Sequence, residues 1–479
     1  MGLPTIPLSH TEIFRQLRAF QIRDTRWSTG QTFGLTFVGD EAERGLVEEA
    51  YRLYQWENAL DPMLFPSLVQ MEKQVIDIAL DHLGGGSQSC GSFTSGGTES
   101  VMLAVKSARD FARKANPGLE KPQMLVPVTA HPCFHKAAHY LGVESVPIPV
   151  DPQTGRAVVE AYRTHITNRT VLLCASAPSF GIGAIDPIAE IGEIALSHNI
   201  PFHVDGCIGA FMLPLLRDLG AKIPPFDLSV PGVTSISMDF HKYAMISKGA
   251  SVVLYNDAEL WRNQTFVWSD WNGYALVNPT VQSSRSGGPL AATWAALHYL
   301  GAPGYRSLAK DLLSATQHVK ERVKNMPYVD VVGDPVVPLV AIRGNERIIF
   351  HIADRMKERG WDMHPQFSHG MLPESVHLTI TPRNIPQIGQ FLDDLAQVSE
   401  LPDPPLPAAL STLAAMLPYL TEDALTPANV RALMDTAEIN VDSPQTKFGH
   451  INVLLNQLKP ALRDRLFLLF YEQLFAGRT

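Results

Sequence analysis

The chain is short of several features that would assign a protein to a class at once. It has four cysteines in 479 residues, Cys90, Cys133, Cys174 and Cys207, and no two of them form a CxxC pair. We therefore expect neither a zinc or other metal site nor a disulfide framework. Reduced thiols in a cytoplasmic protein are the default interpretation.

Basic clusters and long apolar runs are missing as well. The 39 Lys and Arg residues are scattered and are outnumbered by 48 Asp and Glu, which gives a formal net charge of −9. Nucleic-acid binding is therefore not expected. No apolar run reaches ~18 residues. The N-terminus also lacks the charged and apolar regions of a signal peptide, so we expect neither a membrane span nor secretion.

What is present is a hydrophobic share of 45%, enough for a large core. Apolar strand-like runs alternate with helical patterns from residue 98 to 255, which predicts an α/β protein with a mostly parallel sheet covered by helices. We expect four regions in all: an N-terminal helical arm at 1–60, a large sheet domain at 61–302, a small α+β domain at 303–400, and a Pro-rich linker with a helical extension at 401–479. The extension has helical patterns at 410–419, 427–437 and 452–474.

Three features far apart in the chain carry chemistry. Lys242 directly follows the strand-like run Ser235-Ile-Ser-Met-Asp-Phe-His, and Asp205 ends the strand-like run before it. Polar residues at the ends of neighbouring parallel strands meet at one edge of a sheet. The third feature is the turn Gly96-Gly97-Thr98 at the start of a helical pattern, where backbone amides are available to a phosphate.

Together these features match the needs of pyridoxal 5'-phosphate. Lys242 supplies an amine that forms an imine with the cofactor aldehyde. Asp205 supplies a carboxylate that keeps the pyridine nitrogen protonated, so that the ring accepts electrons. We therefore assign the large domain as the cofactor domain, with Gly96, Gly97 and Thr98 at the phosphate.

His131 follows the strand-like run at 124–128 and precedes Pro132. A flat imidazole there is placed to cover one face of the cofactor ring, and a histidine that packs locally is the alternative. The polar segment at 28–37 is either a surface loop or a segment that reaches the site. We also expect Asp186 to be the N-cap of a helix that has Pro187 at its first position.

The motifs resemble a known family. Thr94-Ser-Gly-Gly-Thr-Glu-Ser, His203-Val-Asp-Gly-Cys and Ser235-Ile-Ser-Met-Asp-Phe-His-Lys are similar to pyridoxal-phosphate enzymes of the sphingosine-1-phosphate lyase type, which belong with the group II amino-acid decarboxylases. The resemblance covers about residues 25 to 400. It implies a fold-type-I homodimer with shared active sites and a small amino substrate, with Lys242 as the Schiff-base lysine.

The resemblance also implies roles for further residues. His241 is expected at the cofactor phosphate, and Ser284 and Arg285 are expected to approach that region from the neighbouring subunit. The same Arg285, together with Asn58 and Lys248, is a candidate substrate ligand.

The chain departs from the family where the lyases hold a phosphorylated substrate. Positions that carry histidine or tyrosine in the lyases are here Ile182, Leu276, Asp61 and Phe37. Asp61 would repel a phosphate. The expected activity is a pyridoxal-phosphate-dependent carbon–carbon lyase that acts at Cα, either as an aldehyde-lyase or as a carboxy-lyase. Decarboxylation of a non-phosphorylated amino acid and a non-catalytic cofactor-binding protein are the alternatives.

Overall fold

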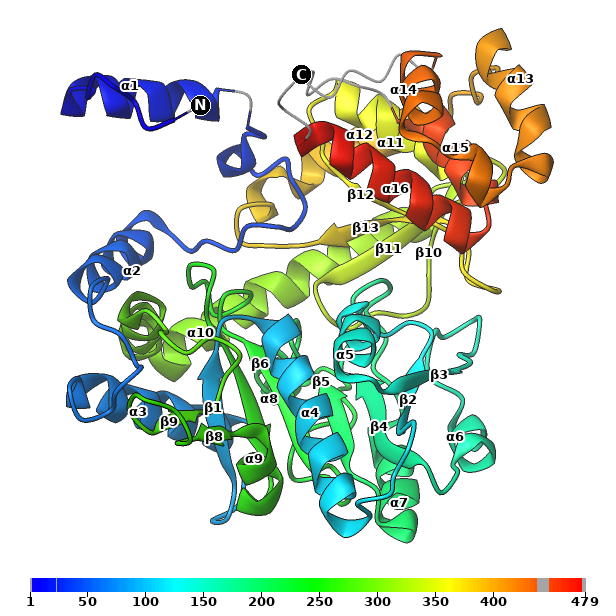
Figure 1. The fold of residues 1–479 in the computed structure, drawn as a ribbon. Helices are drawn as coiled ribbons and strands as arrows, with labels where there is room; N and C mark the ends of the chain where they lie inside the picture. The colour runs from blue at the N-terminus through cyan, green and yellow to red at the C-terminus, as the bar shows by residue number, and fades with distance from the viewer. Residues whose placement is uncertain (1, 23, 437–447, 476–479) are drawn as a thin grey trace.

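The computed structural model describes residues 2–22, 24–436 and 448–475. Figure 1 shows the large sheet and its helices in the lower part of the view, with the small sheet and the C-terminal helices stacked above it.

The large domain is built on a seven-stranded sheet with the order β1-β7-β6-β5-β4-β2-β3. Its strands are β1 (Cys90–Thr94), β2 (Gln123–Pro127), β3 (Glu144–Ile148), β4 (Thr170–Ser176), β5 (Phe202–Asp205), β6 (Ser235–Asp239) and β7 (Ser251–Tyr255). The strands β2 to β6 pair in parallel, and β7 is antiparallel to both of its neighbours. The prediction of a mostly parallel α/β sheet is confirmed.

Helices cover both faces of this sheet. Alternate residues of β4 face different cores, because Leu173 belongs to the larger apolar cluster while Leu172 and Cys174 belong to a smaller one. The covering helices are α3 (Pro66–His82), α4 (Gly97–Ala115), α5 (Cys133–Leu141), α6 (Val159–His165), α7 (Ile188–His198), α8 (Leu213–Asp218) and α9 (Ala258–Gln264).

The expected role of Asp186 is wrong. Helix α7 begins at Ile188, and its N-terminus has no side-chain cap. The Asp186 carboxylate is fully buried and instead accepts hydrogen bonds from the amides of Ala157 and Ser176, both at 2.8 Å. Burial raises the pKa of Asp186 to about 6. Two buried amides that lack another acceptor require the Asp186 carboxylate, so it is not available to cap the helix.

The small domain has a four-stranded antiparallel sheet in the order β10-β11-β13-β12. Its elements are β10 (Val329–Val331), β11 (Leu339–Gly344), α11 (Ile349–Glu358), β12 (His364–Gln366), β13 (Ser375–Thr379) and α12 (Ile388–Ser399). Helix α10 (Gly287–Lys324) connects it to the large domain and is interrupted at Gly301, which has a φ of 53°. The proposed boundary at residue 303 falls just after this interruption.

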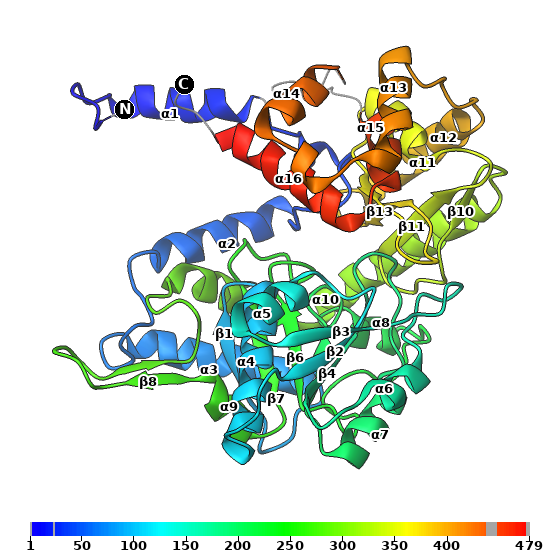
Figure 2. The same ribbon diagram turned by 45° about the vertical axis from the view of Figure 1, so that its right-hand side comes forward.

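Two N-terminal helices precede the sheet domain, α1 (His10–Gln21) and α2 (Glu41–Leu53). No residue of α1 is buried, and the helix extends away from the body in both views (Figures 1 and 2). A two-stranded hairpin, β8 (Phe266–Trp268) and β9 (Leu276–Asn278), also projects from the large domain (Figure 2).

The C-terminal unit, which we define as the described residues from 408 onwards, is helical as expected. It comprises α13 (Ala408–Met416), α14 (Pro427–Thr436), α15 (Gly449–Gln457) and α16 (Pro460–Phe475) around its own apolar core. The prediction of one continuous helix over 452–474 is wrong, because the chain breaks before Pro460, a residue with no amide hydrogen to continue a helix. The last residue of the helix expected at 427–437, Ala437, lies outside the described residues.

Polar contacts join the C-terminal unit to the small domain. The Asp354 carboxylate of α11 accepts hydrogen bonds from the amides of Phe448 and Gly449 at the start of α15. Farther along α15, the Asn456 Oδ1 atom accepts from the amide of Ser368 at 2.7 Å and from its hydroxyl at 3.0 Å. Ser368 lies just after β12, so the unit holds the end of that strand.

Candidate active site

Lys242 lies in the turn that follows β6, next to a buried acid. Its amine is 3.0 Å from Oδ2 of Asp239, the last residue of β6, which is 2% exposed. Burial alone would raise the pKa of Asp239, but Lys242 and a hydrogen bond with His241 outweigh it and hold that pKa well below its usual value. Burial alone would likewise lower the pKa of Lys242, and Asp239 outweighs it, so the net direction is upward. The pair is therefore ionised at neutral pH.

Asp205 ends β5, the strand beside β6. Its Oδ1 atom accepts a hydrogen bond from the Cys207 amide at 3.0 Å, and the Ser237 hydroxyl lies 3.4 Å away. Asp205 and Lys242 line one cavity of about 510 Å³. The strand ends that the sequence predicts to converge do converge.

The turn at Gly96 and Gly97 forms one wall of this cavity. Helix α4 begins at Gly97, and the amides of Gly97 and Thr98 donate to none of the described residues. A Cβ atom at Gly97 would lie 2.6 Å from the Cys207 sulphur and 2.9 Å from Asp239 Oδ2, so only glycine fits. Free amides at a helix start provide a site for an anionic group.

Two histidines stand at this cavity as expected. The His241 Nδ1 atom accepts a hydrogen bond from the Ala250 amide at 3.2 Å, and its Nε2 atom lies 3.4 Å from Asp239 Oδ2. The His131 Nδ1 atom accepts from the Cys133 amide at 3.2 Å, and burial lowers the pKa of His131. His131 is therefore neutral at pH 7, and its stacking on a cofactor ring stays a prediction.

The polar segment at 28–37 reaches the site, which decides between the two alternatives left open above. Leu35 and Phe37 both line the cavity of Lys242. The Lys248 amine lies 5.2 Å from the centre of the Phe37 ring and 3.4 Å from the His241 carbonyl oxygen. Burial and the neighbouring Lys242 lower the pKa of Lys248. Lys248 is thus a second amine in the cavity.

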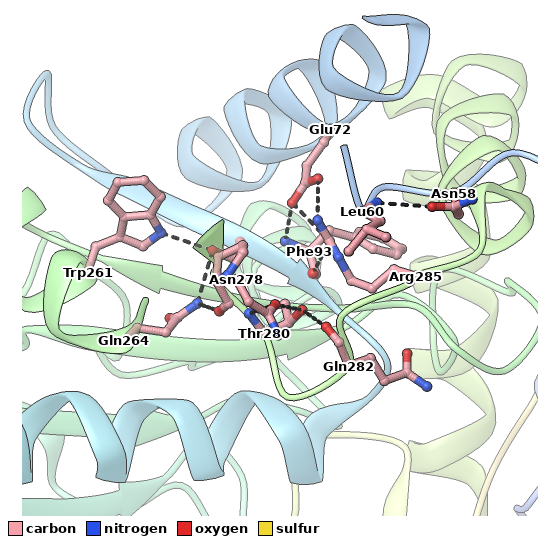
Figure 3. Close-up of polar contacts among 12 residues, drawn as sticks. Asn58, Leu60, Glu72, Phe93, Trp261, Gln264, Asn278, Thr280, Gln282 and Arg285 are labelled. Atoms are coloured by element: carbon pink, nitrogen blue, oxygen red, sulfur yellow. Dashed lines mark hydrogen bonds and ion pairs between the residues drawn. The ribbon is translucent and has the colours of Figure 1, made fainter. Parts of the chain in front are cut away.

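The structure does not bring Ser284, Arg285 and Asn58 into this cavity. Ser284 and Arg285 line an adjacent cavity of about 290 Å³, which shares Ser95 and Lys248 with the first. The Arg285 guanidinium is paired with Glu72 at 3.0 Å and donates to the Phe93 carbonyl at 2.7 Å; Figure 3 shows both contacts.

Asn58 is engaged locally as well. Its Oδ1 atom accepts a hydrogen bond from the Leu60 amide at 3.2 Å (Figure 3). Substrate contacts by Arg285 and Asn58 therefore stay predictions.

The four departures from the lyase pattern occupy different places. Phe37 lines the cavity, whereas Ile182 packs in a small apolar cluster and Leu276 lies in the projecting hairpin. Asp61 is exposed, and its Oδ1 atom accepts a hydrogen bond from the Met63 amide at 2.8 Å. Of these four residues, Phe37 is the one that lines the cavity within one chain.

Sequence reasoning missed several residues that line the cavity, namely Asp239, Phe180, His364 and Thr379. Asp239 could have been found, because it precedes Lys242 by three positions at a strand end. His364 and Thr379 gave no local signal, because small-domain strands carry them to the site from far along the chain.

The described residues contain neither a cluster of metal ligands nor a membrane-spanning helix. Among residues 2–22, 24–436 and 448–475, no group of three or more His, Cys, Asp and Glu residues could hold a metal ion. No helix in those ranges is long and apolar enough to cross a membrane. The four cysteines are free thiols.

The residues of the cavity fit pyridoxal phosphate. Gly97 lets the start of α4 lie directly against Cys207 and Asp239 at the floor of the cavity, and the unpaired amides of Gly97 and Thr98 suit a phosphate. Asp205 offers a buried carboxylate to a ring nitrogen, and Lys242 offers an amine to an aldehyde. A mostly parallel sheet with these groups at its strand ends defines a pyridoxal-phosphate-dependent enzyme of fold type I.

Comparison with known families agrees with this class. A family model described as the pyridoxal-dependent decarboxylase conserved domain matches residues 56–344, and the chain belongs to that family. A second model, described as the C-terminal putative HTH domain of pyridoxal-dependent enzymes, matches residues 411–473, which lie in the C-terminal unit.

Individual relatives show which members of the family the chain is similar to. Sphingosine-1-phosphate lyase of Arabidopsis thaliana is 38% identical over 397 residues, which cover 81% of this chain and 72% of the relative. The solved sphingosine-1-phosphate lyase of Burkholderia pseudomallei is 35% identical with a TM-score of 0.80, covering 84% of this chain and 92% of the other.

A more distant structure shows the fold alone. The glutamate decarboxylase of Lactobacillus brevis has a TM-score of 0.74 at 18% identity, and the match covers 84% of this chain and 94% of the other. The predicted family, fold, cofactor and enzyme class are confirmed: the protein is a pyridoxal-phosphate-dependent lyase similar to sphingosine-1-phosphate lyases.

Proposed function

We propose that the protein is a carbon–carbon lyase that breaks a bond at Cα of a small amino substrate, with Lys242 as the residue that bonds the cofactor aldehyde. The observation that carries this proposal is the convergence of three groups on one cavity of about 510 Å³. These are the Lys242 amine, the Asp205 carboxylate and the unpaired amides at the start of α4. Family membership supports the same conclusion.

When bound, the cofactor supplies a ring that accepts the electrons of the broken bond. In this proposal Asp205 holds the ring nitrogen, and Gly96, Gly97, Thr98 and His241 hold the phosphate. His131 covers one face of the ring through an imidazole whose Nδ1 atom is already engaged by the Cys133 amide.

Proton movement falls to Lys242. With Asp239 3.0 Å from its Nζ atom, a Lys242 amine that is not bonded to the cofactor would be held as an ammonium. An ammonium at that place is able to donate a proton to Cα after bond cleavage, as general acid. Asp239 is thus proposed as a positioning residue for Lys242.

Two reactions remain candidates, and each has a supporting observation. The similarity to proteins named sphingosine-1-phosphate lyases supports cleavage that releases an aldehyde. Phe37 lines the cavity at a position where the lyases carry a tyrosine, and this loss of a polar group supports decarboxylation of a non-phosphorylated amino acid. Lys248 is the cation, apart from Lys242, among the described residues that line the cavity.

The test uses purified protein with added pyridoxal phosphate. We expect a visible absorbance band that is lost in Lys242→Ala and kept in Lys248→Ala, the matched control from the same cavity. The protein is then incubated separately with amino acids and with a phosphorylated amino alcohol, while carbon dioxide and aldehyde are measured. Absence of the band in the wild-type protein refutes the proposal. A band with neither product indicates a cofactor-binding protein without this activity.

We infer in addition that the protein works as a homodimer with shared active sites. Helix α1 has no buried residue, and the hairpin of β8 and β9 exposes Trp268, Trp271 and Tyr274 by half or more. A second copy of the chain would cover such apolar surface. Ser284 and Arg285 are then proposed to serve the cofactor region of the partner.

Complementation tests the shared site. Lys242→Ala and Ser284→Tyr proteins, each expected to be inactive, are unfolded and refolded together. Shared sites predict partial activity in the mixture, because a mixed dimer contains one intact site. A mixture as inactive as its components, or a monomeric mass by light scattering, contradicts the inference.

A further inference from the structure

His364 reaches the cavity of Lys242 from outside the cofactor domain. It is the first residue of β12 in the small domain and lines the cavity together with Thr379 of β13. Its ladder partner on β13 is His377, whose ring packs against Phe180 with the centroids 4.3 Å apart. His364 is therefore part of an aromatic wall that continues from the cavity into the small domain.

His364 differs from the other histidines in and beside this wall. Each of the others has a ring nitrogen in a hydrogen bond: His131 with the Cys133 amide at 3.2 Å, His241 with the Ala250 amide at 3.2 Å, and His377 with the Thr379 hydroxyl at 2.7 Å. Among the described residues, none forms a hydrogen bond with either ring nitrogen of His364. His364 is therefore the histidine of this wall whose ring nitrogens are not taken up by any described residue.

The backbone on either side of His364 packs closely. Gly34 has a φ of 97°, and a Cβ atom there would lie 3.2 Å from Thr379 Oγ1 and 3.4 Å from His364 Cε1. Two residues along β12, the Gln366 Nε2 atom donates to the Gly181 carbonyl at 2.8 Å. The strand that carries His364 is therefore anchored beside the cavity, which is what a specific contact from its side chain requires.

The charge state of His364 restricts what it can recognise. Burial lowers the pKa of His364, and the Asp362 carboxylate opposes this only in part. At pH 7 the neutral ring has one N–H donor and one lone-pair acceptor. A hydroxyl group also donates and accepts, whereas a carboxylate only accepts and an ammonium only donates.

We propose that His364 is a specificity-determining residue that hydrogen-bonds a hydroxyl group of the substrate, on the part that extends beyond Cα. The proposal rests on the proposed function, because it takes Lys242 as the point at which the amino substrate is held. It makes the cavity selective for hydroxylated amines over otherwise identical amines that lack the hydroxyl.

The test compares paired probes on the holoenzyme. L-threonine is compared with L-2-aminobutyrate, and L-threo-phenylserine with L-phenylalanine, each titrated while the visible absorbance of the cofactor is followed. One neutral hydrogen bond contributes roughly tenfold in affinity. We expect the hydroxylated member of each pair to bind about tenfold more tightly to the wild-type protein.

Two variants assign that preference to the residue. His364→Leu is expected to reduce the difference to within about twofold. His369→Ala, which removes an exposed histidine from the same hairpin, is the matched control and is expected to keep it. His364→Gln, whose amide both donates and accepts, is expected to keep part of the preference and serves if the leucine variant does not fold.

The outcomes separate this inference from the proposed function. Equal affinities within both probe pairs in the wild-type protein, or an unchanged preference in His364→Leu, overturn the role of His364. A wild-type protein that shows no visible band with added cofactor refutes the proposed function instead. An intact band without hydroxyl preference leaves the proposed function standing and removes only the contact by His364.

Discussion

Replacing Asp239 with Asn should change the protonation of Lys242 in the cofactor-free protein. The two charges lie 3.0 Å apart in a buried site. At an effective dielectric constant of about 20, such a pair interacts by about 5 kcal/mol. Desolvation and the contact with His241 offset part of this interaction energy, so we take about half of it as the net effect on Lys242. Each 1.4 kcal/mol is a factor of ten, so the fraction of neutral Lys242 amine at pH 7 should rise about a hundredfold.

The assay measures the amine directly. Cofactor-free wild-type and Asp239→Asn proteins are treated with a limiting amount of an acylating reagent between pH 6 and pH 10, and labelled peptides are quantified by mass spectrometry. Only the neutral amine reacts, so labelling of Lys242 in the variant should begin at a lower pH. Labelling of the exposed Lys222 is the internal reference and should not change.

Asp227→Asn is the matched control. Asp227 is also 2% exposed and is paired with Arg217 at 3.4 Å, but it does not line the cavity. It should leave the labelling profile of Lys242 unchanged. If Asp239→Asn also leaves the profile unchanged, or shifts it to higher pH, the ion pair does not set the charge of Lys242 and the reasoning is refuted.

Three further predictions concern stability and binding. Burial and the Asp40 carboxylate raise the pKa of Glu43 from 4.5 to about 7, so the folded state holds the proton more tightly and stability falls as the pH rises across that window. Glu43→Gln should therefore raise the free energy of urea unfolding by about 1–2 kcal/mol at pH 8 and by nearly nothing at pH 4. Gly97→Ala drives a methyl group against Cys207 and Asp239 and so displaces the start of α4, which should weaken cofactor binding at least tenfold by absorbance titration, with the melting temperature of the cofactor-free protein as the check on folding. Asn456→Leu removes the acceptor for Ser368 and should speed amide exchange in α15 and β12, whereas Asn456→Asp should restore slow exchange; equal exchange in all three proteins contradicts the contact.

The elements that the sequence predicted share a local signature. Lys242 and Asp205 stand at the ends of apolar strands, and Gly97 opens a helix, so a few neighbouring residues suffice to recognise each. The features that it did not predict depend on contacts between remote segments. Asp186 satisfies amides of two other segments rather than a helix end, and His364 enters the cavity on a small-domain strand. No pattern within a short window carries that information.

Two further expectations involve contacts or breaks that a local pattern does not show. Arg285 lies beside a turn at the start of a helix and was expected near the cofactor or the substrate, yet within one chain its guanidinium pairs with Glu72 of α3 (Figure 3). The apolar face over 452–474 has one helical period, yet Pro460 divides it into two helices. In the first case a distant acid pairs with the residue while its contact with substrate stays a prediction, and in the second a single missing amide hydrogen divides the helix.

The hydrogen bonds between Asn456 and Ser368 couple α15 to β12, the strand that begins with His364. A molecule that pulls α15 off the hairpin would loosen the strand that carries His364, and affinity in the cavity would drop. Thermodynamic linkage requires the reverse with equal free energy, so a filled cavity would resist removal of the helices. Through this one contact, the stability of the last helices and the affinity of the cavity would depend on each other.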